Sequence, residues 1–428
     1  MRMIGRYLLR YAMGAGLLLG PVLSNANPPL EFDPMSQSPI QQAIILMDDY
    51  AIRTGLDSER PIKRYLWTDA FAVCNYLGLA RATGKRHYRD LALRLVNQIH
   101  HTLGRHPLDD PREGWISGLD EQAGEDHPTR GGLRIGKPLP ERGPQDPFDE
   151  RLEWERDGQY FHYLTKWMHA LDQLSRATGD PSYNRWAREL AATAYAAFTL
   201  PATGNRPARL YWKMSIDLSR PLVTSMGQHD PQDGYITALQ LDNTAATFPP
   251  ATGGPDLTEA IQQFKTMTKQ GDWASPDPLG IGGLMVAAYR VSQLSHLTTP
   301  EERHLLARLL SAALTGLQYY AASGELQAPA EYRLAFRELG LAIGLMAGER
   351  IPHLVEQDSS SVDRDILNQL HTLSRYFPLS DQIRDYWSDS RHRNNNTWQE
   401  HRDINEVMLA TSLVPDRFLE ITEKFKGR

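Results

Sequence analysis

Two short polar runs of the sequence combine carboxylates, imidazoles and aromatic rings in a way that suits acid–base chemistry. The first run spans residues 150–163 and the second spans residues 225–235. Hydrolysis of a glycosidic bond needs two carboxyl groups, one protonated as an acid and one ionised as a base or nucleophile. We expect each run to supply one member of such a pair.

The first run leads from an irregular segment into a helix that we expect over residues 157–178. Asp157 is placed to cap that helix. We expect Glu153 and Glu155 to lie in an extended segment and only one of them to face a ligand. Trp154 and Tyr160 suit stacking on pyranose rings. The catalytic candidates of this run are Glu153, Glu155 and Asp157, and the binding candidates are Trp154, Arg156, Tyr160 and His162.

The second run is dense in polar side chains beside small residues. Asp230 followed by Pro231 predicts the start of a helix, and Asp233 lies one turn later. Gly227 and Gly234 leave room for a ligand to approach. The catalytic candidates here are His229, Asp230 and Asp233, and the binding candidates are Gln228 and Tyr235, with Trp212 and Lys213 upstream.

The same residues permit a different reaction. A polysaccharide lyase or a sugar epimerase needs a base near a sugar C–H bond, and a lyase also needs a cation that neutralises a uronate carboxylate. The bases would come from His162, His229 and Tyr235, and the cations from Arg134, Arg156 and Lys213.

Cofactor motifs are not evident. Residues 131–137 match the first seven positions of a phosphate-binding loop, but Pro138 stands where Ser or Thr should bind magnesium. No zinc-protease, nucleophile-elbow or dinucleotide motif occurs. His100, His101 and His106 lack an evident carboxylate or Cys partner. We therefore expect no cofactor and no metal.

The elements that must position these residues are helices. Apolar residues recur mainly at helical spacing. The pattern predicts about twelve helices, over residues 37–54, 64–83, 86–104, 157–178, 180–199, 231–247, 256–271, 277–296, 300–323, 330–348, 361–376 and 399–413.

A repeated turn pairs some of these helices. Residues 79–88 resemble residues 174–183, and in both copies a glycine, Gly84 or Gly179, fits the left-handed position that ends a helix. Asp180 can cap the next helix and Pro181 suits its first turn. Such hairpins bury their apolar faces only by stacking on one another.

About six hairpins with this turn resemble the (α/α)6 toroids of the six-hairpin glycosidase-like superfamily. The resemblance is architectural, and it implies an all-α fold with a single domain over residues 27–428. It also implies that long loops form a cleft at one end of the ring. The longest irregular segment is 105–149, which we expect to lie beside 225–235, and residues 210–214 read as a short strand within a loop.

The N-terminus has the features of a secretory signal peptide over residues 1–26. Arg2, Arg6 and Arg10 precede the short apolar stretch 11–23, and Ser24 and Ala26 offer small residues for cleavage. We therefore predict a periplasmic or secreted protein that has no integral membrane span once the signal is removed. A net charge of −6 disfavours nucleic acid as a partner.

These observations favour an exported carbohydrate-active protein whose partner is a carbohydrate. Our leading hypothesis is a glycoside hydrolase that acts on a polysaccharide or an oligosaccharide through paired carboxylates. The alternatives are a lyase or epimerase that uses a His or Tyr base, and a non-catalytic protein that binds glycans or assists envelope assembly.

Overall fold

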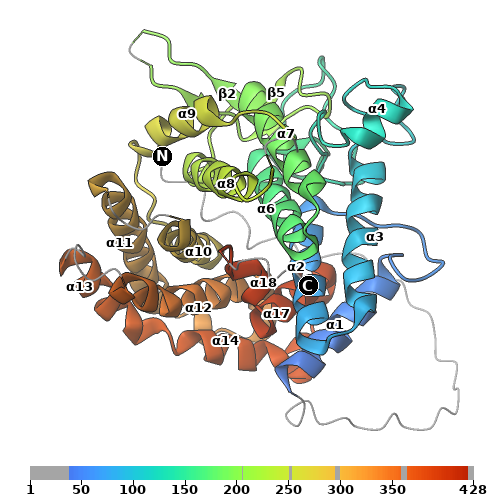
Figure 1. The fold of residues 1–428 in the computed structure, drawn as a ribbon. Coiled ribbons are helices and arrows are strands. Elements are labelled where there is room, and N and C mark those ends of the chain that lie inside the picture. The colour runs from blue at the N-terminus through green and yellow to red at the C-terminus, as the bar shows by residue number, and fades with distance from the viewer. Residues whose placement is uncertain (1–37, 205, 250–252, 295–298, 358–363, 423–428) are drawn as a thin grey trace, which may run out of the picture.

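The computed structural model describes residues 38–204, 206–249, 253–294, 299–357 and 364–422. The predicted signal peptide, residues 1–26, lies outside this part of the chain. The described residues are mostly helical, and the helices are arranged around a common centre (Figure 1).

An inner ring forms the centre of the fold. Its members each pack against the next, and the last packs against the first. In ring order they are α2 (Leu66–Thr83), α6 (Phe161–Thr178), α8 (Asp230–Ala245), α10 (Pro278–Leu294), α12 (Ala335–Gln357) and α17 (Arg402–Leu413).

An outer layer surrounds the ring, and the chain alternates between the two layers (Figure 1). Its helices are α1 (Pro39–Arg53), α3 (Arg86–Leu103), α7 (Pro181–Phe198), α9 (Thr258–Thr268), α11 (Pro300–Ala322) and α14 (Leu379–Ser388). The outer helix α1 packs on α17, so the two ends of the chain close the ring together. The described helices thus form an all-α, (α/α)6 toroid, which confirms the predicted fold class.

Burial explains which helices are inside. Every residue of α2 from Leu66 to Leu79 is buried, as expected for a helix that neighbours cover on all sides. By contrast, α3 buries one stripe that includes Leu91, Leu95 and Ile99 and exposes its other side. Glycines tighten the ring between α10 and α12, because a Cβ atom on Gly282 would lie 2.1 Å from the carbonyl oxygen of Gly340.

The predicted helix turns are confirmed. Gly84 and Gly179 end α2 and α6 with φ angles of 69° and 76°. Asp180 accepts a hydrogen bond from the backbone N–H of Ser182 at 2.9 Å, and Pro181 is the first residue of α7. Each of the twelve predicted ranges overlaps a helix of the structure.

Several predicted boundaries were wrong. Residues 361–376 were expected to be one helix, but α13 (Arg364–Leu373) packs on α11, and the helix that covers α12 is α14. α12 also continues to Gln357, with Pro352 inside it. α6 begins at Phe161 rather than at residue 157, because Gly158 has a φ of 145° and Gln159 begins the strand β1. Asp157 therefore does not cap this helix.

Short elements fill the long connections. The segment 105–149 contains α4 (Glu121–Asp126), and Glu153 and Glu155 lie on α5 (Glu150–Glu155) rather than in an extended segment. One antiparallel sheet consists of β1 (Gln159–Tyr160), β4 (Lys213–Met214) and β5 (Pro221–Val223). A second sheet pairs β2 (Thr199–Leu200) with β3 (Arg209–Leu210). The strand expected over 210–214 is therefore present as two shorter strands.

The remaining short helices follow in the second half of the chain. They are η3 (Glu325–Gln327), η4 (Ala330–Tyr332), η5 (Ser374–Tyr376), α15 (Ser390–Arg393), α16 (Asn396–Glu400) and α18 (Asp416–Leu419). α18 packs against α2, α6 and α10 inside the ring. Its Phe418 stacks on Phe71 with ring centroids 4.4 Å apart, and the Phe418 carbonyl oxygen lies 3.0 Å from His169 Nε2. This C-terminal segment fills the ring away from the ends where the inner helices begin.

Among the described residues, none of the helices has the length and apolar character that crossing a membrane requires.

Candidate functional site

The inner helices all begin at one end of the ring, which we call the mouth. Because inner and outer helices alternate, the connections that enter the inner helices meet at this end. They are long, with residues 104–160 before α6 and 199–229 before α8, whereas α2 and α3 are joined by only two residues. Long connections at one end of a rigid scaffold are where binding residues usually lie.

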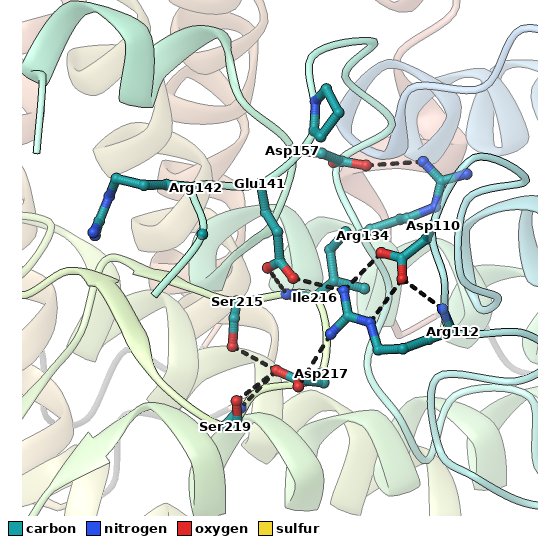
Figure 2. Close-up of polar contacts among 12 residues, drawn as sticks. Asp110, Arg112, Arg134, Glu141, Arg142, Asp157, Ser215, Ile216, Asp217 and Ser219 are labelled. Carbon is teal, nitrogen blue, oxygen red and sulfur yellow. Dashed lines mark hydrogen bonds and ion pairs between the residues drawn. The ribbon is translucent and has the colours of Figure 1, made fainter. Parts of the chain in front are cut away.

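A network of ion pairs holds the two longest connections together (Figure 2). Arg112 forms ion pairs with Asp110 at 2.7 Å, Glu141 at 2.7 Å and Asp217 at 3.1 Å. Glu141 also accepts a hydrogen bond from the Ile216 backbone N–H at 2.7 Å. The loop 105–149 is therefore fixed to the segment 209–223, which leads directly into the run 225–235.

The first turn of α8 carries two carboxyl groups in different environments. Asp230 is 3% exposed, and the one hydrogen bond that its carboxyl group accepts from the described residues comes from the Gly227 backbone N–H, 3.2 Å from Oδ2. Burial, together with the charge of Asp233, raises the pKa of Asp230 to about 7. His229, not Asp230, precedes the helix as its cap residue. Asp230 is therefore a buried carboxyl group that is largely protonated at mildly acidic pH.

Asp233 has a cation beside it. Its Oδ2 lies 2.8 Å from Nζ of Lys166 on α6, and its side chain is 16% exposed. Burial acts to raise the pKa of Asp233, but the charge and hydrogen bond of Lys166, with the charges of Arg290 and His229, together outweigh it, and the pKa lies below its usual value. One turn of one helix therefore holds a protonated acid and an ionised carboxylate.

His162 lies against this pair. Its Nδ1 is 3.9 Å from Asp230 Oδ1 and accepts a hydrogen bond from Trp212 Nε1 at 3.2 Å. An indole nitrogen can only donate, so the proton of the neutral imidazole is on Nε2. Burial lowers the pKa of His162 to about 4, so the ring is neutral at physiological pH. His162 thus has no free lone pair with which to act as a base.

His229 has the same tautomer as His162, but no described residue donates a hydrogen bond to its Nδ1. Its Nε2 lies 2.8 Å from the carbonyl oxygen of Trp273, which can only accept, so Nε2 carries the proton and the Nδ1 lone pair is free. Burial lowers its pKa, and the nearby charges of Asp233 and Asp277 oppose that shift. Of the two histidines beside the α8 carboxyl groups, His229 is the one with basic capacity.

Other residues of the mouth were not predicted from the sequence. Asp277, at the start of α10, forms an ion pair with Arg337 on α12 at 2.8 Å. The hydroxyl groups of Tyr65 and Tyr163 lie 2.7 Å apart, which joins the starts of α2 and α6. Lys166, Asp277 and Arg337 each lie in or beside the first turns of an inner helix. In a toroid every second helix along the chain is an inner one. A charged residue near the start of such a helix is therefore the signal that could have identified them.

Two of the predicted candidates are instead buried in a closed ion pair. Glu153 is 2% exposed and its carboxylate contacts Arg142 at 2.7 Å and Lys213 at 3.1 Å. Lys213 is fully buried, and its amine also donates to the backbone carbonyls of Glu153 and Arg156. These contacts fix α5 to β4 and leave neither charge for a ligand.

Further candidates have structural contacts of the same kind. Asp157 accepts hydrogen bonds from Arg134 at 2.8 Å and the Gly136 N–H at 3.0 Å. Gln228 donates to the carbonyls of Asp272 and Ala274, and Arg156 donates to those of Pro140 and Glu141. Tyr160 and Tyr235 are buried, so the predicted sugar-stacking surface at Tyr160 is covered.

Trp154 and Glu155 remain accessible. Trp154 is 39% exposed and its ring meets that of Trp212 at a centroid distance of 4.8 Å. Glu155, the next residue, is exposed. The predicted residues that the structure brings together at the α8 end are therefore His162, Trp212, His229, Asp230 and Asp233.

Cavities and metal-ligand clusters add nothing to this site. A surface cavity of about 560 Å³ lies elsewhere, between the loop 55–62 and α3, lined by Leu56, Arg60, Arg94 and Gln98 among others. Within the described ranges, no three His, Cys, Asp or Glu side chains are grouped so that they could hold a metal ion.

The described helices form an (α/α)6 toroid, and the mouth of that toroid carries one carboxyl group with a raised pKa beside one with a lowered pKa. No protein-family model matches the sequence, and no curated protein matches it. The chain is similar in structure to a family 76 glycoside hydrolase from a bovine Bacteroides thetaiotaomicron strain, with 10% identity and a TM-score of 0.49 over 90% of this chain and 79% of that one.

It is also similar to a family 76 α-mannanase from Bacteroides thetaiotaomicron, with 10% identity, a TM-score of 0.48 and coverage of 91% and 98%. A third similar structure is cellobiose 2-epimerase from Spirochaeta thermophila, with 13% identity, a TM-score of 0.46 and coverage of 92% and 100%. Similarity at this level defines neither the substrate nor the reaction of this chain, which have to be inferred from its own residues.

Proposed function

We propose that this chain is an exported enzyme that hydrolyses a glycosidic bond with Asp230 and Asp233. One observation carries the proposal: the first turn of α8 holds a carboxyl group whose pKa is raised to about 7 and an ionised carboxylate paired with Lys166 at 2.8 Å. Hydrolysis needs this division into acid and base, and the same environments would not be needed for a merely structural pair.

The spacing of the two residues favours a retaining reaction. Side chains three residues apart on a helix lie on one face with Cβ atoms about 5–6 Å apart, which allows their carboxyl groups a similar separation. Retaining glycosidases place their carboxyl groups about 5–5.5 Å apart, whereas inverting ones need about 6.5–9.5 Å. We therefore assign Asp233 as the nucleophile and Asp230 as the acid.

The reaction would then take place in two steps. The Asp233 carboxylate bonds to the anomeric carbon while the bond to the leaving oxygen breaks, and Asp230 gives its proton to that oxygen. In the second step Asp230 takes a proton from water, the water oxygen bonds to the anomeric carbon, and Asp233 is released. His162 presents Nε2–H as a hydrogen-bond donor, and Trp212 and Trp154 offer aromatic surfaces beside it.

A sugar epimerase or polysaccharide lyase is the second candidate, and the free Nδ1 lone pair of His229 supports it. His229 would remove the C–H proton, and Arg337 would act as the cation. This role excludes His162, whose Nδ1 already accepts the Trp212 N–H.

The test is turnover of a panel of neutral and acidic oligosaccharides, with the anomer of the product observed by proton NMR. We expect wild type to release a reducing end with retained configuration, and Asp233→Asn to lose roughly 10²–10⁴-fold in kcat. The matched control is Glu150→Gln, which removes an exposed carboxylate elsewhere at this end. Inverted product, unsaturated product, epimerised sugar or unchanged turnover by Asp233→Asn would each refute the assignment.

Export is part of the proposal and rests on the N-terminal pattern of Arg2, Arg6 and Arg10 before a short apolar stretch. N-terminal sequencing of protein expressed from the full chain should find Asn27 as the first residue, in a periplasmic or culture fraction. Recovery of the uncleaved chain from the cytoplasm would contradict export and leave the assignment of Asp230 and Asp233 untouched.

A further inference from the structure

A second polar cluster lies at the mouth beside the start of α2. Two segments run side by side there, because the Ile135 N–H donates to the Gly158 carbonyl at 2.8 Å and the Asp157 N–H donates to the Leu139 carbonyl at 2.7 Å. Lys137 lies in the middle of the first segment. Its position is therefore fixed beside the residues that follow α5.

The same segment is joined to α2. The Leu66 N–H donates to the Ile135 carbonyl at 3.1 Å. Gly136 has a φ of 93°, and a Cβ atom there would lie 2.3 Å from the Arg64 carbonyl oxygen, so only glycine allows this approach. Lys137 is thus held next to Tyr65, whose hydroxyl meets that of Tyr163.

The Lys137 amine is a cation that no described residue pairs with. The side chain is half-buried, yet within the described part of the chain it forms neither an ion pair nor a hydrogen bond. Burial lowers its pKa. The neighbouring cations at this end are paired with carboxylates; they are Arg134, Arg142, Lys166, Lys213 and Arg337. A half-buried ammonium without an acceptor is unfavourable, and a ligand oxygen would relieve that cost.

A carboxylate acceptor lies close enough to act on this amine through its charge. Glu155 is exposed and its charge acts on both Lys137 and Tyr65, but it contacts neither closely enough for an ion pair or a hydrogen bond. The hydroxyl groups of Tyr65 and Tyr163 share one hydrogen bond, so one of their two protons is free to donate elsewhere. The exposed ring of Trp154 precedes Glu155 in the chain.

We propose that Lys137, Glu155 and Tyr65 form a binding subsite for the hydroxyl groups of a neutral sugar residue. An ammonium and a carboxylate that are close but not in contact can donate to one hydroxyl group and accept from the next. Glu155 and Asp157 would repel a uronate carboxylate at this position, which favours a neutral sugar. None of these three residues contacts Asp230 or Asp233 within the described part of the chain, so we place the subsite beside the reacting bond and expect a substrate of at least two sugar residues. This inference rests on the proposed function and names its substrate class.

The test is calorimetric titration of the whole protein at pH 6 with glucose and mannose oligomers of one to six residues, and with oligogalacturonates as the anionic arm. We expect wild type to bind neutral oligomers more tightly than the monosaccharides. Lys137→Ala and Glu155→Gln should each weaken oligomer binding about tenfold or more, as expected for a lost hydrogen bond to a charged group.

Two controls match these variants. Lys85→Ala removes an exposed lysine at the opposite end of the ring, and Glu150→Gln removes an exposed carboxylate from the same short helix as Glu155. Both should bind as wild type does. The proposal is overturned if Lys137→Ala and Glu155→Gln also bind as wild type does, if wild type prefers oligogalacturonates, or if wild type binds none of the oligomers.

Failure of this subsite and failure of the proposed hydrolysis are distinguishable. Binding that depends on Lys137, without cleavage of any bound oligomer, refutes hydrolysis and leaves the subsite standing. Cleavage of oligomers by Lys137→Ala and Glu155→Gln with wild-type KM refutes the subsite and leaves hydrolysis standing.

Discussion

Glu153 and Asp230 are both buried carboxyl groups near the mouth, 2% and 3% exposed, but their surroundings differ completely. Glu153 is neutralised by Arg142 and Lys213. Asp230 has a single backbone N–H donor and the negative charge of Asp233 beside it. A buried charge without a partner is costly, and burial of this kind persists mainly where it serves a function. Burial thus leaves Glu153 neutralised by cations and leaves Asp230 with a raised pKa, which is why we propose a catalytic role for Asp230 and not for Glu153.

Removal of Glu153 should have the largest effect on stability. Glu153→Ala leaves the fully buried Lys213 without its carboxylate, and breaking a buried pair in this way costs about 3–5 kcal/mol. Urea unfolding at pH 7 measures this loss, and turnover per folded molecule should not change. The exposed neighbour Glu150→Ala should shift the unfolding free energy by less than about 1 kcal/mol. Equal stability of the two variants would show that the pair is not structural.

Replacement of Asp230 should raise the free energy of unfolding above neutral pH, whereas Glu153→Ala lowers it. Because folding raises its pKa from 3.8 to about 7, the group contributes stability that is complete below pH 3.8 and lost as the pH rises through 7. The loss amounts to up to roughly 4 kcal/mol at pH 8. Asp230→Asn cannot ionise, so its stability relative to wild type should increase from pH 4 to pH 8 in urea titrations. A difference that is the same at both values would contradict the raised pKa.

Replacement of Lys166 should shift the pH–rate profile, a smaller effect than those above. It tests whether the two carboxyl groups of α8 differ because Lys166 is paired with Asp233. In Lys166→Met, Asp233 loses the ammonium at 2.8 Å, so its pKa should rise by about 1–3 units. The acidic limb of the pH–rate profile should then move to higher pH. A profile whose acidic limb does not move would mean that Asp233 is not the ionised group that catalysis needs.

The helices were predictable because they depend on local patterns. Apolar spacing identified each helix of the inner ring but missed α14 of the outer layer, and the turns at Gly84 and Gly179 were predicted from glycine and cap residues alone. The boundary errors arose from tertiary contacts. α6 begins late because Gln159 and Tyr160 pair with Met214 and Lys213, a contact that no local pattern reports.

The site was predictable only in part, for the same reason. Asp230 and Asp233 were candidates because they lie close in sequence. The roles of Glu153 and Lys213 depend on a pairing across sixty residues, which closure of the loops creates. Asp277 and Arg337 were missed because each looks like an ordinary charged residue near a helix start until the ring brings them together.

The pH dependence of kcat/KM on a cleaved oligosaccharide tests the division of roles between Asp230 and Asp233 most directly. Wild type should show activity that rises as Asp233 ionises below pH 4 and falls as Asp230 loses its proton near pH 7. Asp230→Asn should lack the fall near pH 7 and retain only residual turnover. A wild-type profile that is flat from pH 4 to pH 9, or one that rises through pH 7, would contradict the assignment of Asp230 as the acid.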